Sequence, residues 1–85
     1  MIQVKDVQNI GKLAREVRKA QSLDQLTAGA LAGSGITFVS QFENGKETVR
    51  LGKALELLDA LGIKVYLDLP LSDSELIVTK NKESG

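Results

Sequence analysis

The sequence predicts a mostly α-helical domain in which four helices are followed by one β-strand. Three observations lead to this prediction. Apolar residues recur at spacings of three and four through most of the first sixty positions, which is the period of an amphipathic helix. A glycine-containing turn separates two short helical stretches in this region. After Gly62 the apolar period changes to two, which is the period of a strand.

The first helix is predicted over residues 7–20, with Asp6 as its N-cap. Its apolar face is formed by Val7, Ile10, Leu13, Ala14 and Val17. Asp24 then caps a second, short helix that ends at Leu31 or Ala32. This second stretch is rich in alanine and glycine, and such small side chains let another helix approach closely.

A tight turn connects this second helix to a third. Gly33 supplies the backbone freedom that the turn requires. The third helix is predicted to begin at residue 35 or 36 and to end at Glu43, with Val39 and Phe42 in the core. Asn44-Gly45 then ends this helix, because both residues tolerate the left-handed conformation.

A fourth helix is expected to be capped by Thr48 and to end at Gly62. Residues 63–69 then alternate in the pattern of a strand, with apolar positions at Ile63, Val65, Leu67 and Leu69. A single strand cannot satisfy its own backbone groups, and the chain offers no obvious second strand. We therefore expect residues 1–69 to form one domain whose last strand pairs across a dimer. Residues 70–85 are expected to form a flexible tail, in which the apolar stretch 76–78 could add a strand or dock on a partner.

The composition argues against several kinds of chemistry. There is no histidine and no cysteine, so the commonest general base, the commonest metal ligand and any disulfide framework are missing. The glycines do not follow a strand, as a nucleotide-binding loop requires, and the serines have no histidine to activate them. We expect no enzyme activity, no cofactor and no metal. No segment resembles a signal peptide or a membrane span, so the expected location is cytoplasmic, with no membrane partner.

The formal net charge is zero, but the charges are unevenly distributed along the chain. Residues 1–53 contain eight basic and five acidic residues, whereas residues 54–85 contain three basic and six acidic residues. A basic first part and an acidic second part suit a nucleic-acid face that is backed by a different surface.

Two short helices that are joined by a tight glycine turn, with a further helix on each side, are the arrangement of a helix-turn-helix domain. The second helix of such a pair enters the DNA major groove, and its exposed N-terminal residues meet the base edges. Four residues occupy these positions on the face opposite Val39 and Phe42. They are Ile36, Thr37, Ser40 and Gln41.

The segment from Leu23 to Lys46 resembles the core of the Xre, or lambda-repressor-like, family. The similar parts are the Leu-x-Gln opening of the second helix, the tripeptide Leu31-Ala32-Gly33 and the tetrapeptide Glu43-Asn44-Gly45-Lys46. More specifically, residues 38–53 and 57–62 are similar to HipB-type antitoxins. The resemblance covers about residues 7–69 and implies a four-helix lambda-repressor-like domain.

The resemblance also implies roles for single residues. DNA-phosphate contacts are implied for Gln25, Asn44, Lys46 and Arg50. A buried ion pair between Arg18 and Glu43 is implied to tie the first helix to the third.

The function that the resemblance implies is that of a dimeric antitoxin. Such a protein binds double-stranded operator DNA, represses its own HipBA-like operon and engages a HipA-like kinase toxin. Two alternatives remain open. One is a stand-alone Xre-type repressor without a toxin, and the other is a protein-binding inhibitor module that does not touch DNA.

Overall fold

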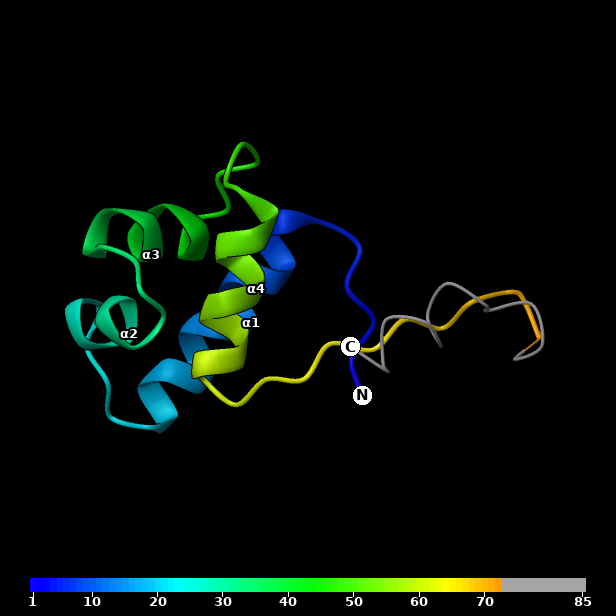
Figure 1. Cartoon of the computed structure of the whole chain (residues 1–85), viewed down its shortest axis with the longest axis horizontal. Helices are drawn as coiled ribbons and strands as arrows, with labels where there is room; N and C mark the ends of the chain where they lie inside the picture. Colours follow the sequence, from blue (N-terminus) through cyan, green and yellow to red (C-terminus); the bar gives the residue numbers. More distant parts are fainter. Residues whose placement is uncertain (73–85) are drawn as a thin grey trace.

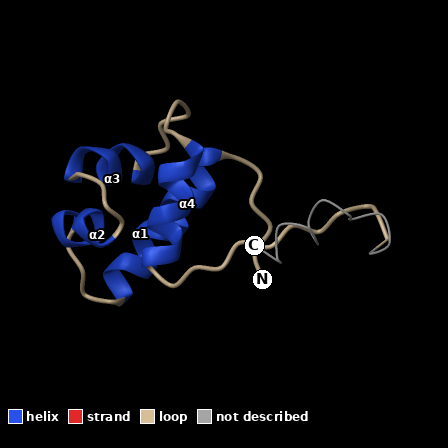
Figure 2. Cartoon of the chain, in the orientation of Figure 1, coloured by secondary structure: helices blue, strands red, loops and turns tan. Residues whose placement is uncertain are grey.

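In the computed structural model, which describes residues 1–72, the chain folds into four α-helices. They are α1 (Val7–Ala20), α2 (Gln25–Leu31), α3 (Ile36–Glu43) and α4 (Leu51–Ala60). Figures 1 and 2 show α2 and α3 at one end of the domain, with both terminal segments extending from the opposite side. The predicted four-helix domain is thus confirmed. Residues 73–85, which include the apolar stretch 76–78, lie outside the described residues.

The first two helices begin at the capping residues that the sequence predicts. Asp6 Oδ1 accepts the backbone N–H of Asn9 at 2.7 Å, and Asp24 Oδ1 accepts that of Thr27 at 2.7 Å. The bond from Thr27 also lowers the pKa of Asp24 below its usual value. Each cap satisfies one of the donors that the first turn of a helix leaves without a partner. In contrast, α3 follows Gly35, which has no side chain to cap it.

The start of the fourth helix differs from the prediction. Thr48 does not cap it: α4 begins at Leu51, and Arg50 occupies the N-cap position without a side-chain hydrogen bond. Val49 packs against the core from within the preceding loop. Because burying this side chain places Val49 outside the helix, the helical turn starts two residues later than the sequence suggests.

The core lies where the four helices meet, and small residues let the helices approach closely. It is formed by Ala14, Ala28, Ala32, Val39, Phe42, Ala54, Leu57, Leu58 and Leu61. The turn between α2 and α3 contains Gly33 with φ of 69°, a conformation that favours glycine. Gly11 has a different reason to be glycine: a Cβ on α1 at this position would overlap the backbone carbonyl oxygen of Phe42 on α3.

A buried ion pair joins α1 to α3. Arg18 Nε donates to Glu43 Oε2 at 2.6 Å, and Arg18 Nη2 donates to Glu43 Oε1 at 2.9 Å. Both residues are less than a tenth exposed. Arg18 Nη1 donates to the carbonyl oxygen of Leu23 at 2.7 Å, and Gln25 Nε2 donates to Glu43 Oε1 at 3.0 Å. The pair therefore connects α1, the turn after it, α2 and α3.

The ion pair also sets the ionisation of its two members. Burial by itself would raise the pKa of Glu43, but the hydrogen bonds from Arg18 and Gln25 outweigh it and hold this pKa below its usual value. The hydrogen bond to Glu43 raises the pKa of Arg18. Both side chains are charged at neutral pH, and each satisfies the charge that burial would otherwise leave unpaired.

After Gly62, the chain is extended but makes no strand. Residues 1–72 contain no β-strand at all, so the predicted strand over residues 63–69 is absent from the single chain. The physical reason is the one that the sequence already raises: a strand exists only when its backbone groups pair with another strand. Pairing across a dimer remains a prediction. Within residues 1–72, none of the helices has the length and apolar character that crossing a membrane requires.

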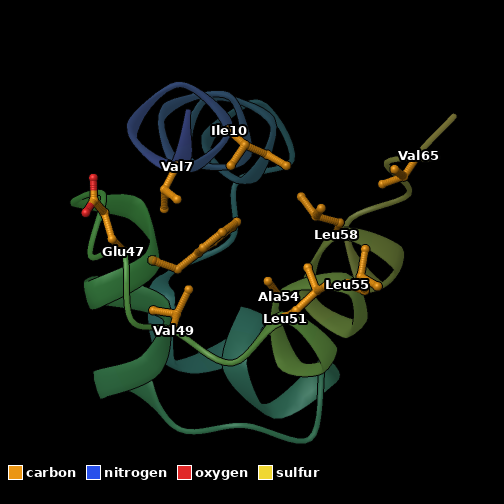
Figure 3. Close-up of a pocket in the computed structure, with 10 residues that line it drawn as sticks. Val7, Ile10, Glu47, Val49, Leu51, Ala54, Leu55, Leu58 and Val65 are labelled. Atoms are coloured by element: carbon orange, nitrogen blue, oxygen red, sulfur yellow. The ribbon is translucent and has the colours of Figure 1, made fainter. Parts of the chain in front are cut away.

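The helices leave an apolar cleft of about 350 Å³ beside the core. Figure 3 shows Val7 and Ile10 of α1 on one side of this cleft and Ala54, Leu55 and Leu58 of α4 on the other. The extended segment reaches the cleft as well, because Val65 forms part of its wall. A single copy of the chain therefore does not close its own apolar interior between α1 and α4.

The close approach at Gly11 gives a first testable prediction. We expect Gly11→Ala to lower the free energy of unfolding by about 1–3 kcal/mol, because the added methyl group overlaps the Phe42 carbonyl. The control is Gly52→Ala on α4, where a Cβ meets no atom within 4 Å. We expect the control to be neutral or stabilising by up to about 1 kcal/mol. Urea unfolding followed by circular dichroism measures both, and equal effects would contradict the predicted overlap.

The ion pair gives a prediction about pH. Since the folded pKa of Glu43 is lowered, its contribution to stability is fully present above the unfolded pKa of about 4.3. This contribution is lost as the pH falls through the folded value. We expect Glu43→Gln to be less stable than the wild type at pH 7 and to lose less of its stability in acid. Urea unfolding from pH 7 down to pH 3 tests this, with the exposed Glu56→Gln as the control. A Glu43→Gln curve as steep as that of the wild type would contradict it.

Candidate nucleic-acid interface

The candidate interface is the outer face of α3, which the rest of the described chain leaves uncovered. Ile36, the first residue of the helix, is 47% exposed, and Thr37 is exposed beside it. Ser40 and Gln41 are half-buried one turn further along. Because positions i, i+1, i+4 and i+5 share one side of a helix, the four residues that the sequence predicts as base readers form one continuous strip.

The opposite side of α3 is held firmly against the domain. Val39 and Phe42 are fully buried, and Glu43 is fixed by the ion pair with Arg18. The rings of Phe38 and Phe42 lie stacked, with their centroids 6.0 Å apart. The buried side of the helix thus sets the direction in which the exposed strip points.

Polar residues continue the strip beyond the C-terminal end of α3. Asn44 is exposed, and its Nδ2 donates to Ser40 Oγ at 3.5 Å. The backbone N–H of Lys46 donates to the carbonyl oxygen of Gln41 at 3.0 Å, which places Lys46 directly beside the end of the helix with an exposed side chain. Four of the predicted contact residues are therefore brought together here: Ser40, Gln41, Asn44 and Lys46.

Gln25 is only partly available for the phosphate contact that the resemblance implies. It is the first residue of α2, it is half-buried, and one of its amide N–H groups is used by Glu43. Its role within the chain is to join the N-terminus of α2 to α3. A second N–H of the same amide remains for a further acceptor.

Arg50 is placed apart from this cluster, at the N-cap of α4 and at the end of the loop over residues 46–50. It is exposed. The four predicted dimer residues lie on the extended segment, at the other end of the domain from α3 (Figure 1). Among them Ile63 is half-buried against the core, whereas Val65, Leu67 and Leu69 are exposed.

Two contacts that position the interface are missing from the sequence-based reasoning. One is the approach of Gly11 to the Phe42 carbonyl, which sets the spacing of α1 and α3. A glycine in the middle of a helix costs about 1 kcal/mol relative to alanine, and this cost is the signal that could have found it. The other is the bond of Gln21 Nε2 to the carbonyl oxygen of Leu61 at 2.7 Å, which ties the end of α1 to the end of α4. No sequence pattern points to this pair.

Comparison with known proteins identifies the family. Residues 15–67 match the family model described as helix-turn-helix. The "Uncharacterized HTH-type transcriptional regulator y4mF" of Sinorhizobium fredii (strain NBRC 101917 / NGR234) is 39% identical over 67 residues, which are 79% of this chain and 88% of that protein.

Solved structures with the same fold include two that contain HipB. The structures of a HipA-HipB-O2-O3 complex and of a HipB-O4 20mer complex each match with a TM-score of 0.75 at 17% identity, over 84% of this chain and all of that chain. The restriction-modification controller protein C.AhdI from Aeromonas hydrophila matches with a TM-score of 0.62 at 36% identity, over 69% of this chain and 86% of that chain.

The fold, the uncovered face of α3 and these similarities agree with one another. Members of this family act typically by binding and not as enzymes. The chain belongs to the Xre-like helix-turn-helix family and is a DNA-binding transcriptional regulator.

Proposed function

We propose that this protein is a dimeric operator-binding repressor of its own operon and the HipB-like antitoxin of a HipA-like kinase toxin. The observation that carries the DNA-binding part is the exposed strip on α3, which is directed away from the domain by the buried residues Val39, Phe42 and Glu43. A helix that presents such a strip fits the major groove of duplex DNA.

The chemistry of the strip indicates how bases are read. The amide of Gln41 can bond adenine bidentately, and the hydroxyl of Ser40 can donate or accept. Ile36 and Thr37 present methyl groups, which suit contact with the methyl group of thymine. No residue of α3 is basic, so we propose a readout that depends on one amide, hydroxyl groups and apolar contacts.

Phosphate contacts supply the affinity in this proposal. Asn44 and Lys46 follow the recognition helix with exposed side chains, and Arg50 adds a charge near the start of α4. The free amide N–H of Gln25 lies at the N-terminus of α2, where the helix dipole favours an anion. Because these contacts release counterions from DNA, we expect the affinity to fall steeply with salt.

A dimer follows from the extended segment over residues 63–69, whose apolar positions are largely exposed in the single chain. In a dimer of this family the two recognition helices read half-sites that lie about 34–36 Å apart on one side of the duplex. Footprinting of the promoter upstream of the gene tests this spacing directly.

The antitoxin part of the proposal is supported by the fold that this chain shares with HipB in the HipA-HipB-O2-O3 complex. It is also supported by the extended segment that follows α4 in place of a fifth helix. Co-purification of this chain with the product of the neighbouring gene, followed by a kinase assay, is the test. Absence of a stable complex with any adjacent kinase would leave the operator-binding part alone.

One observation favours a second candidate, a stand-alone regulator without a toxin. The curated HTH-type regulator and the controller protein C.AhdI are 39% and 36% identical to this chain, whereas the HipB chains are 17% identical. The same co-purification separates the two candidates, since only an antitoxin has a kinase partner.

Two substitutions distinguish base reading from phosphate binding. We expect Gln41→Ala to cost about 1–3 kcal/mol at a single base position and to relax the sequence preference there. We expect Lys46→Ala to weaken all duplexes alike and to reduce the dependence on salt. Gel shifts with an operator duplex and a scrambled duplex at several salt concentrations measure both effects.

The matched control for these substitutions is Lys5→Ala, because Lys5 belongs to the N-terminal segment at the far side of the domain from α3 (Figure 1). We expect this control to bind both duplexes as the wild type does. A Gln41→Ala variant that retains the full base preference would show that α3 docks in another orientation.

A further inference from the structure

Both terminal segments line one groove on the side of the domain away from α3. Residues 1–4 and 63–68 border this groove, which has a volume of about 1260 Å³. Its remaining walls come from Ile10, Leu13 and Val17 of α1 and from Leu58 of α4. The groove is continuous with the apolar cleft of Figure 3, because Ile10, Leu58 and Val65 line both.

The two terminal segments are apolar and unpaired. Ile2 is 68% exposed, Val65 is 51% exposed and Leu67 is 79% exposed. Within residues 1–72, the backbone of residues 1–5 and 64–71 makes no hydrogen bond. Exposed extended chain of this kind is a template for pairing with another extended chain.

We infer that a second copy of this chain docks on this groove through a two-fold sheet, in which residues 63–69 pair antiparallel about Tyr66 and residues 1–5 flank the pair. The inference rests on the dimer of the proposed function and adds its register and the N-terminal contact. A closed two-fold interface uses the same segment from both copies, and the two segments then run in opposite directions.

The charges of the segment select the register. Antiparallel pairing about Tyr66 places Lys64 of each copy opposite Asp68 of the other, which gives two cross-strand pairs of opposite charge. Pairing about Lys64 or about Asp68 would instead place like charges opposite each other, which is destabilising. The segment from residue 63 to residue 69 is therefore self-complementary in charge only about its central residue.

The apolar side of the segment is complementary in the same register. Pairing about Tyr66 places Ile63 opposite Leu69 and Val65 opposite Leu67, so that all four apolar residues lie on one face. That face is the one directed at α1 and α4, since Ile63 already packs against the core. Pro70 follows directly, and a residue without an N–H is suited to the end of a strand.

The N-terminal segment has the same period of two. Ile2 and Val4 alternate with Gln3 and Lys5, and residues 1–4 already border the groove. Figure 1 shows this segment on the side of the domain opposite α3, so it does not extend toward a DNA duplex on that helix. Ile2 and Val4 therefore add apolar contact to the copy that occupies the groove.

Charge reversal in the full-length chain tests the register. We expect Lys64→Asp and Asp68→Lys each to raise the dimer dissociation constant about tenfold, because each places two like-charged pairs in the dimer. The double variant restores the opposite charges, and we expect the wild-type dissociation constant. The two single variants change the net charge in opposite directions, so equal weakening by both excludes an effect of net charge. Analytical ultracentrifugation measures the constants, and a double variant as weak as the single ones overturns the register.

A second pair of variants tests the N-terminal contact. We expect Ile2→Ser combined with Val4→Ser to raise the dissociation constant at least about tenfold, because burial of both side chains in the dimer is lost. The control is Leu31→Ser on α2, which is 60% exposed and does not border the groove. We expect it to leave the constant unchanged. Equal behaviour of the two would remove residues 1–5 from the interface.

Gel shifts on the same samples keep this inference separate from the proposed function. A wild-type chain that sediments as a monomer at every concentration and still binds the operator overturns the inference alone. A chain that dimerises with the expected response to the substitutions but binds no duplex overturns the operator-binding proposal alone.

Discussion

The bidentate ion pair between Arg18 and Glu43 is the interaction on which the arrangement of this domain depends. It is buried, and its hydrogen bonds extend to the Leu23 carbonyl and to Gln25, so one pair of side chains links three helices. Such a pair contributes little net stability compared with an apolar replacement, but loss of either partner leaves an unpaired buried charge. Its value here lies in position: Glu43 is the last residue of α3, and fixing it fixes the rotation of that helix.

Close packing of backbone against backbone complements the ion pair. Gly11 lets α1 approach the C-terminal end of α3, and Gly29 brings α2 close to the turn that precedes α3. Neither distance could tolerate a larger side chain without movement of the backbone. The exposed strip from Ile36 to Gln41 is therefore displayed by a helix that is held on its buried side and at both ends. A helix fixed in this way enters a groove without first having to be ordered, which lowers the entropic cost of binding.

The opposite side of the domain is left incomplete in a single chain. The cleft between α1 and α4 and the groove beside it form one apolar surface, and the segments that border it have no backbone partners within residues 1–72. A chain of 85 residues has a small core, so burial of this surface against a second copy would add to a limited stability. The separation of the two surfaces suits a regulator, because self-association at one end leaves the strip on α3 free for DNA.

The sequence by itself determined the four helices, two of their caps, the buried and exposed sides of α3 and the family. These features depend on local periodicity, on capping residues and on a motif, all of which are contained in short stretches of chain. Only the tertiary structure decided that α4 begins at Leu51, that Gly11 meets Phe42 and that Gln25 serves Glu43. It also decided that residues 63–69 form no strand within one chain. The reason is that each of these features depends on contacts between residues that are distant in the sequence, or on a partner strand that one chain does not contain.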